Sequence, residues 1–389
     1  MPMYDAEDIV ELKNKTKRKR RLVRLIVILF LAGAGAALYL THEIWLPKLR
    51  GIGEQAYTTI VNDGRLAEGN FPIEVSSGGD YQLETSEKIL GLLSDSYVFF
   101  YNEEGGLIKK RQHAYTNAVL SMTGGRALIY ESGGNDFSVE TPESVLYKGR
   151  TDKNILFARL SDEGLTAVVT NSDNYDCEIN VYDKKGEIIY SRKCIEKVND
   201  IAFKENGKGC MISYIYAENG SLATSVQDVT FTESGEKWTS PGLDTLGLEV
   251  FACDEGAFIL GIDACGYVDG SGNISSYYSY EGDFAGGDSS GGKSAVIVNN
   301  DDRRRYEAAL FSGGGKEPII IESEHPLLDV VVSGELAYIM SKDTILAYDF
   351  DGSLRSTVQI NDSYTGFVRS EDLIFLKGFG KIDRIDYDS

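Results

Sequence analysis

A turn that recurs every 37 to 49 residues constrains the fold of this chain more than any other feature of its sequence. Each copy starts with an apolar or aromatic residue, and in six of the seven complete copies a glycine follows four positions later, as in VYDKKGEII (181–189) and AYDFDGSLR (347–355). Glycine suits a tight turn between two strands, because it adopts left-handed backbone angles without steric cost. The copies start at Tyr101, Val139, Tyr182, Phe231, Val268, Phe311, Tyr348 and Tyr387, and the glycines are Gly105, Gly186, Gly235, Gly272, Gly315 and Gly352.

Short apolar or alternating runs fill the space between these turns. One repeat contains NILFARLS (154–161), LTAVVTNS (165–172), EINVYD (178–183) and EIIYSRK (187–193), which is four strands. Four strands in about 40 residues are typical of a propeller blade. We therefore predict an all-β fold, an eight-bladed β-propeller over residues 71–389, with seven blades as the alternative. The chain ends soon after Tyr387, so a strand near residues 71–76 is expected to complete the last blade and close the ring.

The only long apolar run, residues 22–40, predicts a single transmembrane helix. As a helix it spans about 28 Å, close to the thickness of a hydrocarbon core. The basic cluster KRKRR (17–21) precedes it and favours a cytoplasmic N-terminus. We expect a basic cytoplasmic tail (1–21), the helix (22–40), a linker (41–70) and an extracytoplasmic propeller. A cleaved signal peptide is the alternative, but the apolar run continues past both A-x-A sites.

Charge is distributed unevenly along the chain, whose formal net charge is −21. Residues 1–40 hold eight Lys and Arg, so the remainder carries 31 basic residues against 56 acidic ones. A body this acidic repels nucleic acid, which we exclude as a partner.

The stretch GDSSGGKS (287–294) matches a phosphate-binding loop and also contains G-x-S-x-G and S-x-x-K. A phosphate loop opens a helix, and an elbow serine needs strand, turn and helix. Here a strand-like AVIVNN (295–300) follows, so we interpret the stretch as a turn between the first two strands of the sixth blade. No nucleotide, catalytic residue or cofactor is predicted.

Metal and disulfide patterns are weak. DGSGN (269–273) imitates the start of a calcium loop, but the twelfth position is Tyr280 rather than Glu, so a structural turn is favoured and no metal is predicted. Five cysteines lack a C-x-x-C motif. Cys177 and Cys194 flank one hairpin and are the best disulfide candidates, while buried free thiols are an equal alternative.

Loop length points to a binding face. The loops NSDNYDCE (171–178), YAENGSLATS (216–225) and NNDDRRRY (299–306) are longer than the turns at the opposite end of the blades. Loops on a rigid scaffold often carry function. Candidate partner-binding residues are Arg303, Arg304 and Arg305 for an anionic group, and Tyr175, Tyr278 and Tyr280 for stacking, although a solvated charge run and packing between blades explain the same residues.

The repeats resemble those of quinoprotein-type eight-bladed propellers, which carry A-x-D-x-x-x-G at the same turn. Ala347 and Asp349 match this pattern, as does Asp183 with Gly186, over about residues 70–389. The chain departs from that family in its tryptophans, since only Trp238 approaches the docking position. The whole layout also resembles a Firmicute family of membrane-anchored propellers of unassigned function, which implies the cell membrane of a bacterium as the location.

These observations favour a non-enzymatic binding or scaffolding module for a protein or cell-wall glycan partner. The alternative is an extracytoplasmic enzyme, hydrolytic or quinone-dependent, with its site at the propeller's central mouth. No converging set of His, Asp and Glu is visible in the sequence, although propeller sites assemble from distant blades.

Overall fold

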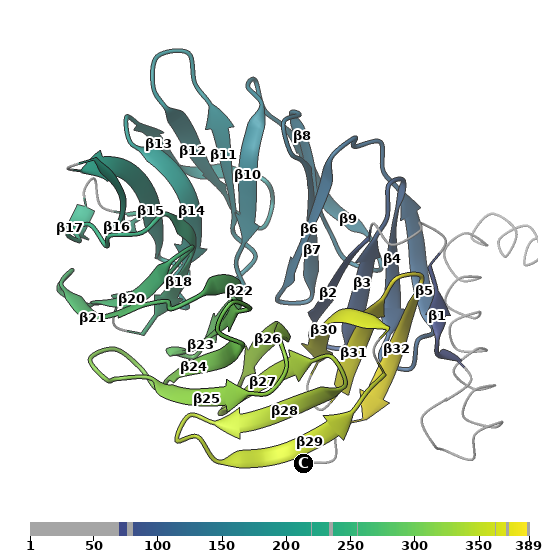
Figure 1. Cartoon of the computed structure of the whole chain (residues 1–389). Helices are drawn as coiled ribbons and strands as arrows, with labels where there is room; N and C mark the ends of the chain where they lie inside the picture. Colours follow the sequence, from purple (N-terminus) through teal and green to yellow (C-terminus); the bar gives the residue numbers. More distant parts are fainter. Residues whose placement is uncertain are drawn as a thin grey trace, which may run out of the picture. The chain divides into compact units, whose positions relative to one another are not determined.

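The computed structural model describes residues 70–75, 81–218, 220–232, 236–254, 256–361, 363–370 and 373–386. Within them the regular elements are β-strands, which form eight four-stranded antiparallel sheets arranged around a common centre (Figure 1). The predicted all-β, eight-bladed propeller is confirmed, and the seven-bladed alternative is wrong. The predicted transmembrane helix at residues 22–40 lies outside the described residues, and the described part has no helix long and apolar enough to cross a membrane.

Each of the first four blades is a run of four consecutive strands. Blade one contains β2 (Gln82–Ser86), β3 (Ile89–Leu93), β4 (Tyr97–Asn102) and β5 (Leu107–Gln112). Blade two contains β6 (Ala118–Thr123), β7 (Arg126–Glu131), β8 (Asp136–Glu140) and β9 (Val145–Arg150). Blade three contains β10 (Ile155–Leu160), β11 (Thr166–Asn171), β12 (Cys177–Tyr182) and β13 (Ile188–Cys194). Blade four contains β14 (Lys197–Phe203), β15 (Gly209–Glu218), β16 (Ser221–Thr230) and β17 (Glu236–Thr239).

The last four blades continue the pattern until the ring closes. Blade five contains β18 (Gly247–Cys253), β19 (Gly256–Gly261), β20 (Ala264–Asp269) and β21 (Ile274–Ser279). Blade six contains β22 (Asp283–Ser290), β23 (Lys293–Asn300), β24 (Arg305–Phe311) and β25 (Ile319–Ser323). Blade seven contains β26 (Leu327–Ser333), β27 (Leu336–Ser341), β28 (Thr344–Asp349) and β29 (Leu354–Gln359). Blade eight contains β30 (Tyr364–Ser370), β31 (Leu373–Gly378), β32 (Lys381–Asp386) and β1 (Ile73–Glu74).

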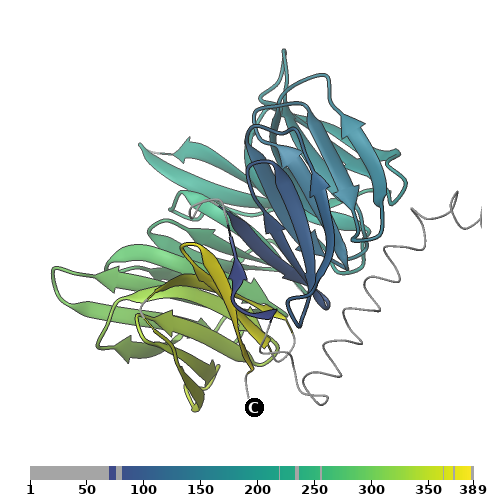
Figure 2. The same cartoon turned by 90° about the vertical axis from the view of Figure 1, so that its right-hand side faces the viewer.

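The ring is closed by chain segments from both ends of the propeller. Ile73 and Glu74 pair with Ile382 and Lys381, so β1 is the outermost strand of blade eight, the place expected for residues 71–76. Figures 1 and 2 show this N-terminal strand beside the C-terminal blade. Next to it, the hydroxyl of Tyr81 donates a hydrogen bond to the carbonyl of Gly378 at 2.7 Å.

The recurring glycine closes the hairpin between the third and fourth strands of a blade. In blade three the N–H of Gly186 donates to the carbonyl of Asp183 at 3.0 Å, and Gly186 has φ 83°. Only glycine adopts this left-handed conformation freely. The same conformation occurs at Gly105 (77°), Gly272 (86°), Gly315 (72°) and Gly352 (86°), whereas Gly235 lies outside the described residues.

Eight apolar clusters fill the spaces between neighbouring blades, one for each interface. The second strand of a blade is covered on both faces and therefore reads as a continuous apolar run, as β19 does in GAFILG. The fourth strand has half-buried and exposed residues in near alternation, as β29 does. The core is thus a ring of inter-blade contacts around a central channel lined by the first strands.

Antiparallel order gives the propeller two different faces. The loops between second and third strands and the connections from one blade to the next lie at one end of the sheets, which we call the connection face. The turns between first and second strands and between third and fourth strands lie at the other end, which we call the hairpin face. The first strand of each blade therefore begins at the connection face.

Candidate functional site

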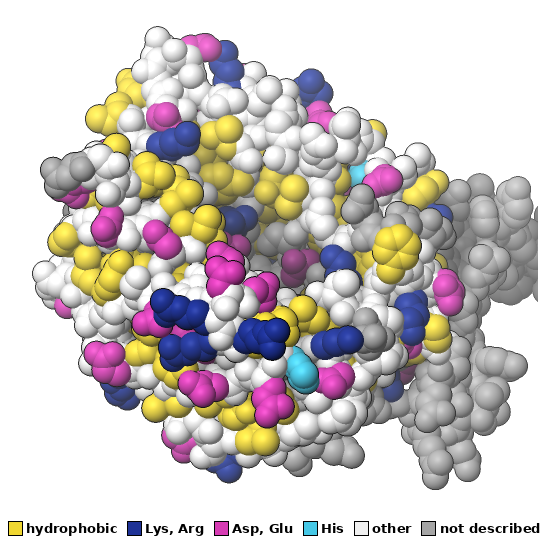
Figure 3. Space-filling model, in the orientation of Figure 1, with side chains coloured by type: hydrophobic (Ala, Val, Ile, Leu, Met, Phe, Trp, Pro, Cys, Tyr) yellow, Lys and Arg dark blue, Asp and Glu magenta, His cyan; other side chains and the backbone are white. Residues whose placement is uncertain are grey.

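Carboxylates from the first strands of five blades line the central channel. Glu84 is on β2 and Glu249 on β18, in blades on opposite sides of the ring, and the charge of Glu249 acts on Glu84. Figure 3 shows acidic side chains at the hollow in the centre of the ring. The set is Glu84, Asp200, Glu249, Asp288 and Asp329.

Three of these carboxylates hold neighbouring blades together. Asp200 accepts a hydrogen bond from the backbone N–H of Val250 in the next blade at 2.9 Å. Asp288 accepts one from Val332 at 2.7 Å, and Asp329 one from Phe367 at 2.9 Å. Such bonds satisfy inner-strand N–H groups that face another blade rather than a strand of their own sheet. These aspartates therefore have a structural role.

Glu84 and Glu249 differ, because within the described residues neither carboxylate accepts a hydrogen bond from a neighbouring blade. Burial, then repulsion from Glu249 and Asp288, raises the pKa of Glu84 to about 7, against a smaller opposing effect of Lys377. Burial and the charge of Asp200 also raise the pKa of Glu249. The Glu249 side chain is reached by water at the mouth but is surrounded by the channel wall, which explains the upward shift.

Two basic side chains offset part of this negative charge. The guanidinium of Arg159 lies 2.8 Å from Asp200, which is 3% exposed, so this cation is committed to a buried ion pair. The ammonium of Lys377 lies 5.2 Å from the centre of the Tyr81 ring, and its charge lowers the pKa of Glu84 and of Asp329. The channel therefore keeps a negative excess near Glu84 and Glu249.

Exposed leucines surround the mouth of the channel. Leu156, Leu248 and Leu328 are the extra residues of β-bulges near the start of the first strands of blades three, five and seven. Their exposed fractions are 39%, 36% and 40%. A bulge turns a side chain away from the regular alternation. The connection face thus combines an acidic centre with apolar side chains around it.

A cavity of about 300 Å³ opens on the same face between blades eight, one and two. Its lining includes Tyr81, Gln82, Asp95, Asn117 and Lys377. Burial raises the pKa of Tyr81 to about 12, so its hydroxyl stays protonated and donates to the backbone. The cavity extends the polar surface beyond the channel.

A second hollow lies on the hairpin face between blades four and five and has a volume of about 720 Å³. Lys204 and Asp228 of its lining form an ion pair with both side chains largely buried, and Glu205, Asp254 and Asp269 outnumber the remaining Lys237.

The three predicted arginines lie together on the connection face, but two of them are paired. Arg303 lies 3.5 Å and Arg305 3.2 Å from Glu281, and Arg305 also contacts the buried Glu307 at 3.0 Å. Arg304 is exposed and completes the turn with φ 50°. Only part of this basic charge is available to an anionic partner.

The predicted tyrosines do not form one site. Tyr278 donates a hydrogen bond to Glu307 at 3.0 Å and packs, with Tyr280, against the cluster between blades five and six. Tyr175 lies apart in blade three, is 42% exposed and has the Lys193 ammonium 5.6 Å from its ring centre. Of the three, Tyr175 is the one that presents its ring to solvent on the connection face.

The stretch at 287–294 is the hairpin between β22 and β23, so a strand follows its glycines. Gly291 and Gly292 have φ of 57° and 74°. The Ser289 hydroxyl donates to the carbonyl of Lys293 at 3.0 Å, and Lys293 is paired with Glu335. This geometry provides neither a helix N-terminus for phosphate nor an elbow serine. No group of three or more His, Cys, Asp or Glu among the described residues could hold a metal ion.

Sequence reasoning did not identify the channel carboxylates, although a signal exists. Asp200, Glu249 and Asp329 each lie eighteen residues after the first residue of the preceding turn, Tyr182, Phe231 and Phe311. Each is also the residue that follows the bulge in its strand. An acidic residue repeated in register could therefore have been detected, whereas Glu84 and Asp288 fall outside this spacing.

Comparison with known proteins gives one family and many structures of the same fold. A sequence profile described as "Family of unknown function (DUF5711)" matches residues 70–377. Curated proteins give no match.

Similar solved structures include the computationally designed Ika8 protein, with a TM-score of 0.60, 12% identity, and coverage of 80% of this chain and 98% of the other. BamB from Moraxella catarrhalis has a TM-score of 0.53, 12% identity, and coverage of 81% and 98%. Chaetomium thermophilum Sqt1, bound to the N-terminus of the ribosomal protein L10, has a TM-score of 0.53, 13% identity, and coverage of 81% and 99%. At these identities the likeness is one of fold.

Proposed function

The chain belongs to the DUF5711 family of unknown function, and from that premise we propose that it is a binding module that holds a protein partner on the connection face of its propeller. In this proposal residues 22–40 anchor it as a single-pass protein in the cell membrane of a Firmicute, with a cytoplasmic N-terminus and an extracytoplasmic propeller. The apolar run and the basic cluster before it support the anchor.

The observation that carries the binding role is the pair of channel carboxylates Glu84 and Glu249, whose negative charge Lys377 and Arg159 offset only in part, next to the exposed leucines at the channel mouth. Like charges held close together in a partly buried channel are unfavourable, and a cation placed between them removes that cost. A protein segment with a lysine or arginine flanked by apolar residues complements this surface. Sqt1, which shares the fold, is bound to a protein N-terminus in its solved structure, so propellers can hold such segments.

Site-specific crosslinking tests this role in intact cells. A photo-crosslinking residue at Leu248 samples the channel mouth, and one at Glu143, exposed on the hairpin face, is the control. We expect one recurrent protein from the Leu248 position, with a crosslinked segment that contains Lys or Arg. The yield should fall when Glu84 and Glu249 are both replaced by glutamine. Equal products from both positions, or a segment without a basic residue, would refute the proposal, and a crosslinked glycan would assign the partner to the cell wall.

The proposed membrane anchor has its own test. Full-length protein should sediment with membranes and be extracted only by detergent, and external protease should remove the propeller from intact cells. A chain that lacks residues 22–40 should not be membrane-bound. If the intact chain is found in the soluble fraction, the anchor is wrong while the binding role still stands.

One observation favours an enzymatic alternative. The pKa of about 7 for Glu84 lies in the range of a general acid or base, and other carboxylates are near it. The alternative is an extracytoplasmic hydrolase with its site at the channel mouth, and loss of hydrolysis of a chromogenic substrate in Glu84→Gln would support it. For the quinone-dependent form, a change in absorbance on addition of cofactor and calcium is the corresponding readout.

A further inference from the structure

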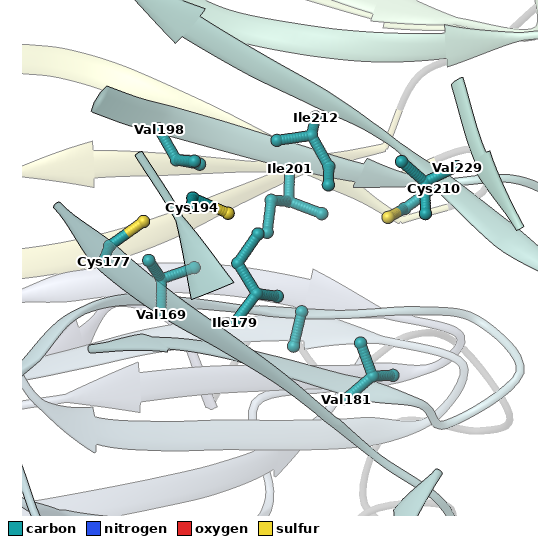
Figure 4. Packing of buried hydrophobic residues seen from close by; sticks show 11 residues of the cluster. Val169, Cys177, Ile179, Val181, Cys194, Val198, Ile201, Cys210, Ile212 and Val229 are labelled. Atoms are coloured by element: carbon teal, nitrogen blue, oxygen red, sulfur yellow. The ribbon is translucent and has the colours of Figure 1, made fainter. Parts of the chain in front are cut away.

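Two cysteines of blade three lie directly opposite each other in adjacent strands. Cys177 is the first residue of β12 and Cys194 the last of β13, and they are register partners. Residues paired in this way have Cα atoms about 4.5–5.5 Å apart, within the range of about 4.4–6.8 Å that a disulfide bridges. Figure 4 shows the two side chains beside each other in the cluster between blades three and four. Both are free thiols in this structure.

The register separates this pair from the other three cysteines. Cys210 belongs to the same buried cluster, but its partners are Phe203 and Val229. Cys253 lies opposite Gly256, and Cys265 lies opposite Leu260 and Tyr278. Within the described residues, Cys177 and Cys194 are therefore the cysteines that the sheet aligns with each other.

We propose that Cys177 and Cys194 form a redox pair that closes to a disulfide on reaction with a small-molecule disulfide of the glutathione class. The Cys194 thiolate attacks one sulfur of oxidised glutathione, and one glutathione thiolate leaves. Cys177 loses its proton to solvent and attacks the Cys194 sulfur of the mixed disulfide, which releases the second glutathione. Two protons and two electrons leave the thiols, and one oxidised glutathione becomes two glutathione molecules.

Cys194 is the better first nucleophile. A hydrogen bond from the Cys177 thiol lowers the pKa of Cys194, against the effect of burial, and the nearby charge of Arg192 lowers it further. The same hydrogen bond, together with burial, raises the pKa of Cys177. Both side chains are almost fully covered, at 0% and 2% exposure, so reaction requires an opening of the strand end.

The position of Cys194 makes that opening local. It is the last residue of the outermost strand of the blade and directly precedes Ile195, which is 78% exposed. Ends of outer strands open at low free-energy cost compared with the core. Once closed, the bridge links the end of loop 172–176, which carries Tyr175, to the connection that leads to blade four, so oxidation fixes two neighbouring segments of the connection face.

Thiol mapping of the full chain tests the pair. After incubation with oxidised glutathione, the protein is unfolded in the presence of iodoacetamide and its peptides are analysed by mass spectrometry. We expect alkylation of three thiols, Cys210, Cys253 and Cys265, and one linked peptide with Cys177 and Cys194. Prior reduction should give five alkylated thiols. Five alkylated thiols without reduction, stable glutathione adducts on Cys194, or a link to Cys210 would each overturn the proposal.

Two alanine variants from the same cluster provide a matched comparison. Cys177→Ala should leave Cys194 alkylated or bound to glutathione, with no intramolecular link. Cys210→Ala removes an equally buried thiol and should retain the Cys177–Cys194 link. If both variants fail to fold, the map of the unaltered chain still decides between a bridge and free thiols.

Discussion

Glu84 on β2 and Glu249 on β18 share the central channel from blades on opposite sides of the ring. Burial and then repulsion from Glu249 raise the pKa of Glu84 to about 7, well above its ordinary value. No strand pairing connects the two residues, and their charges interact only because the eight sheets close into a ring.

The Glu84 carboxyl makes the folded state more stable in mild acid than at pH 8. Its pKa is raised in the folded state, so folded protein binds more protons than unfolded protein between about pH 4.5 and 7. The free energy of unfolding therefore falls as the pH rises through that window. Glu84→Gln should raise the free energy of unfolding by about 2 kcal/mol at pH 8, which is less than removal of a fully buried charge would give. At pH 4.5 it should change that free energy by almost nothing.

Denaturant titrations of both proteins at several pH values measure this difference. Asp329, with a pKa of about 6, also titrates in this window and gives both proteins a residual pH dependence. The quantity to compare is therefore the free energy of unfolding of the variant minus that of the original protein at each pH. A difference that is constant from pH 4.5 to 8 would contradict the assignment.

The amide of Gln82 joins blades one and two. Its oxygen accepts a hydrogen bond from the N–H of Leu120 at 2.8 Å, and its nitrogen donates to the carbonyl of Ala118 at 2.8 Å. Gln82→Ala leaves both backbone groups without these partners and should lower the free energy of unfolding by about 2 kcal/mol. Gln112→Ala on the exposed outer strand should change it by less than about 0.5 kcal/mol. Equal effects of the two variants, measured by denaturant titration, would argue against a stabilising role of the Gln82 hydrogen bonds.

Replacement of a hairpin glycine by alanine should destabilise the fold by an amount that depends on the atoms around that glycine. Alanine at Gly315 meets no atom within 4 Å, so only the left-handed backbone, φ 72°, opposes it, at about 1 kcal/mol. Alanine at Gly186 would also place its Cβ 2.8 Å from Tyr147 of blade two. We expect Gly186→Ala to be the more destabilising variant in thermal unfolding, and the reverse order would show that packing against blade two does not matter.

The closing strand β1 should stabilise the folded ring mainly through the side chain of Ile73. This side chain is 7% exposed and packs against Phe375 and Ile382 of blade eight. Ile73→Ala should cost about 2–4 kcal/mol because it leaves a cavity in the last inter-blade cluster. Ile189→Ala, on an exposed outer-strand position at 45% exposure, is the control and should be nearly neutral. Comparable melting temperatures for the two variants would mean that β1 does not hold the ring together.

The architecture could be predicted because its signals are local. The glycine of a tight hairpin is required by the backbone angles of that one turn, so it recurs wherever the turn recurs, at Gly105, Gly186 and Gly352 among others. The four short strands in each repeat then identified the repeat as a propeller blade. The strand near residues 71–76 followed from counting, because the last repeat lacked a fourth strand.

The channel could be predicted only in part. Asp200, Glu249 and Asp329 share a register that the sequence contains, but their different roles depend on which N–H group the next blade presents to each carboxylate. The arginines at 303–305 suggested free positive charge, whereas Glu281, from the connection between blades five and six, takes up much of it. Partners from other blades are not visible in a linear pattern.

The sequence by itself determined the strand content and the repeat, and it favoured eight blades over seven, because these features depend on contacts between residues close in the chain. Only the tertiary structure decided which side chains share the channel, which carboxylates accept a hydrogen bond from the next blade, and which two cysteines lie opposite each other. The physical reason is that charge repulsion, burial and thiol pairing depend on distances of a few ångströms between residues, and ring closure and strand register set those distances.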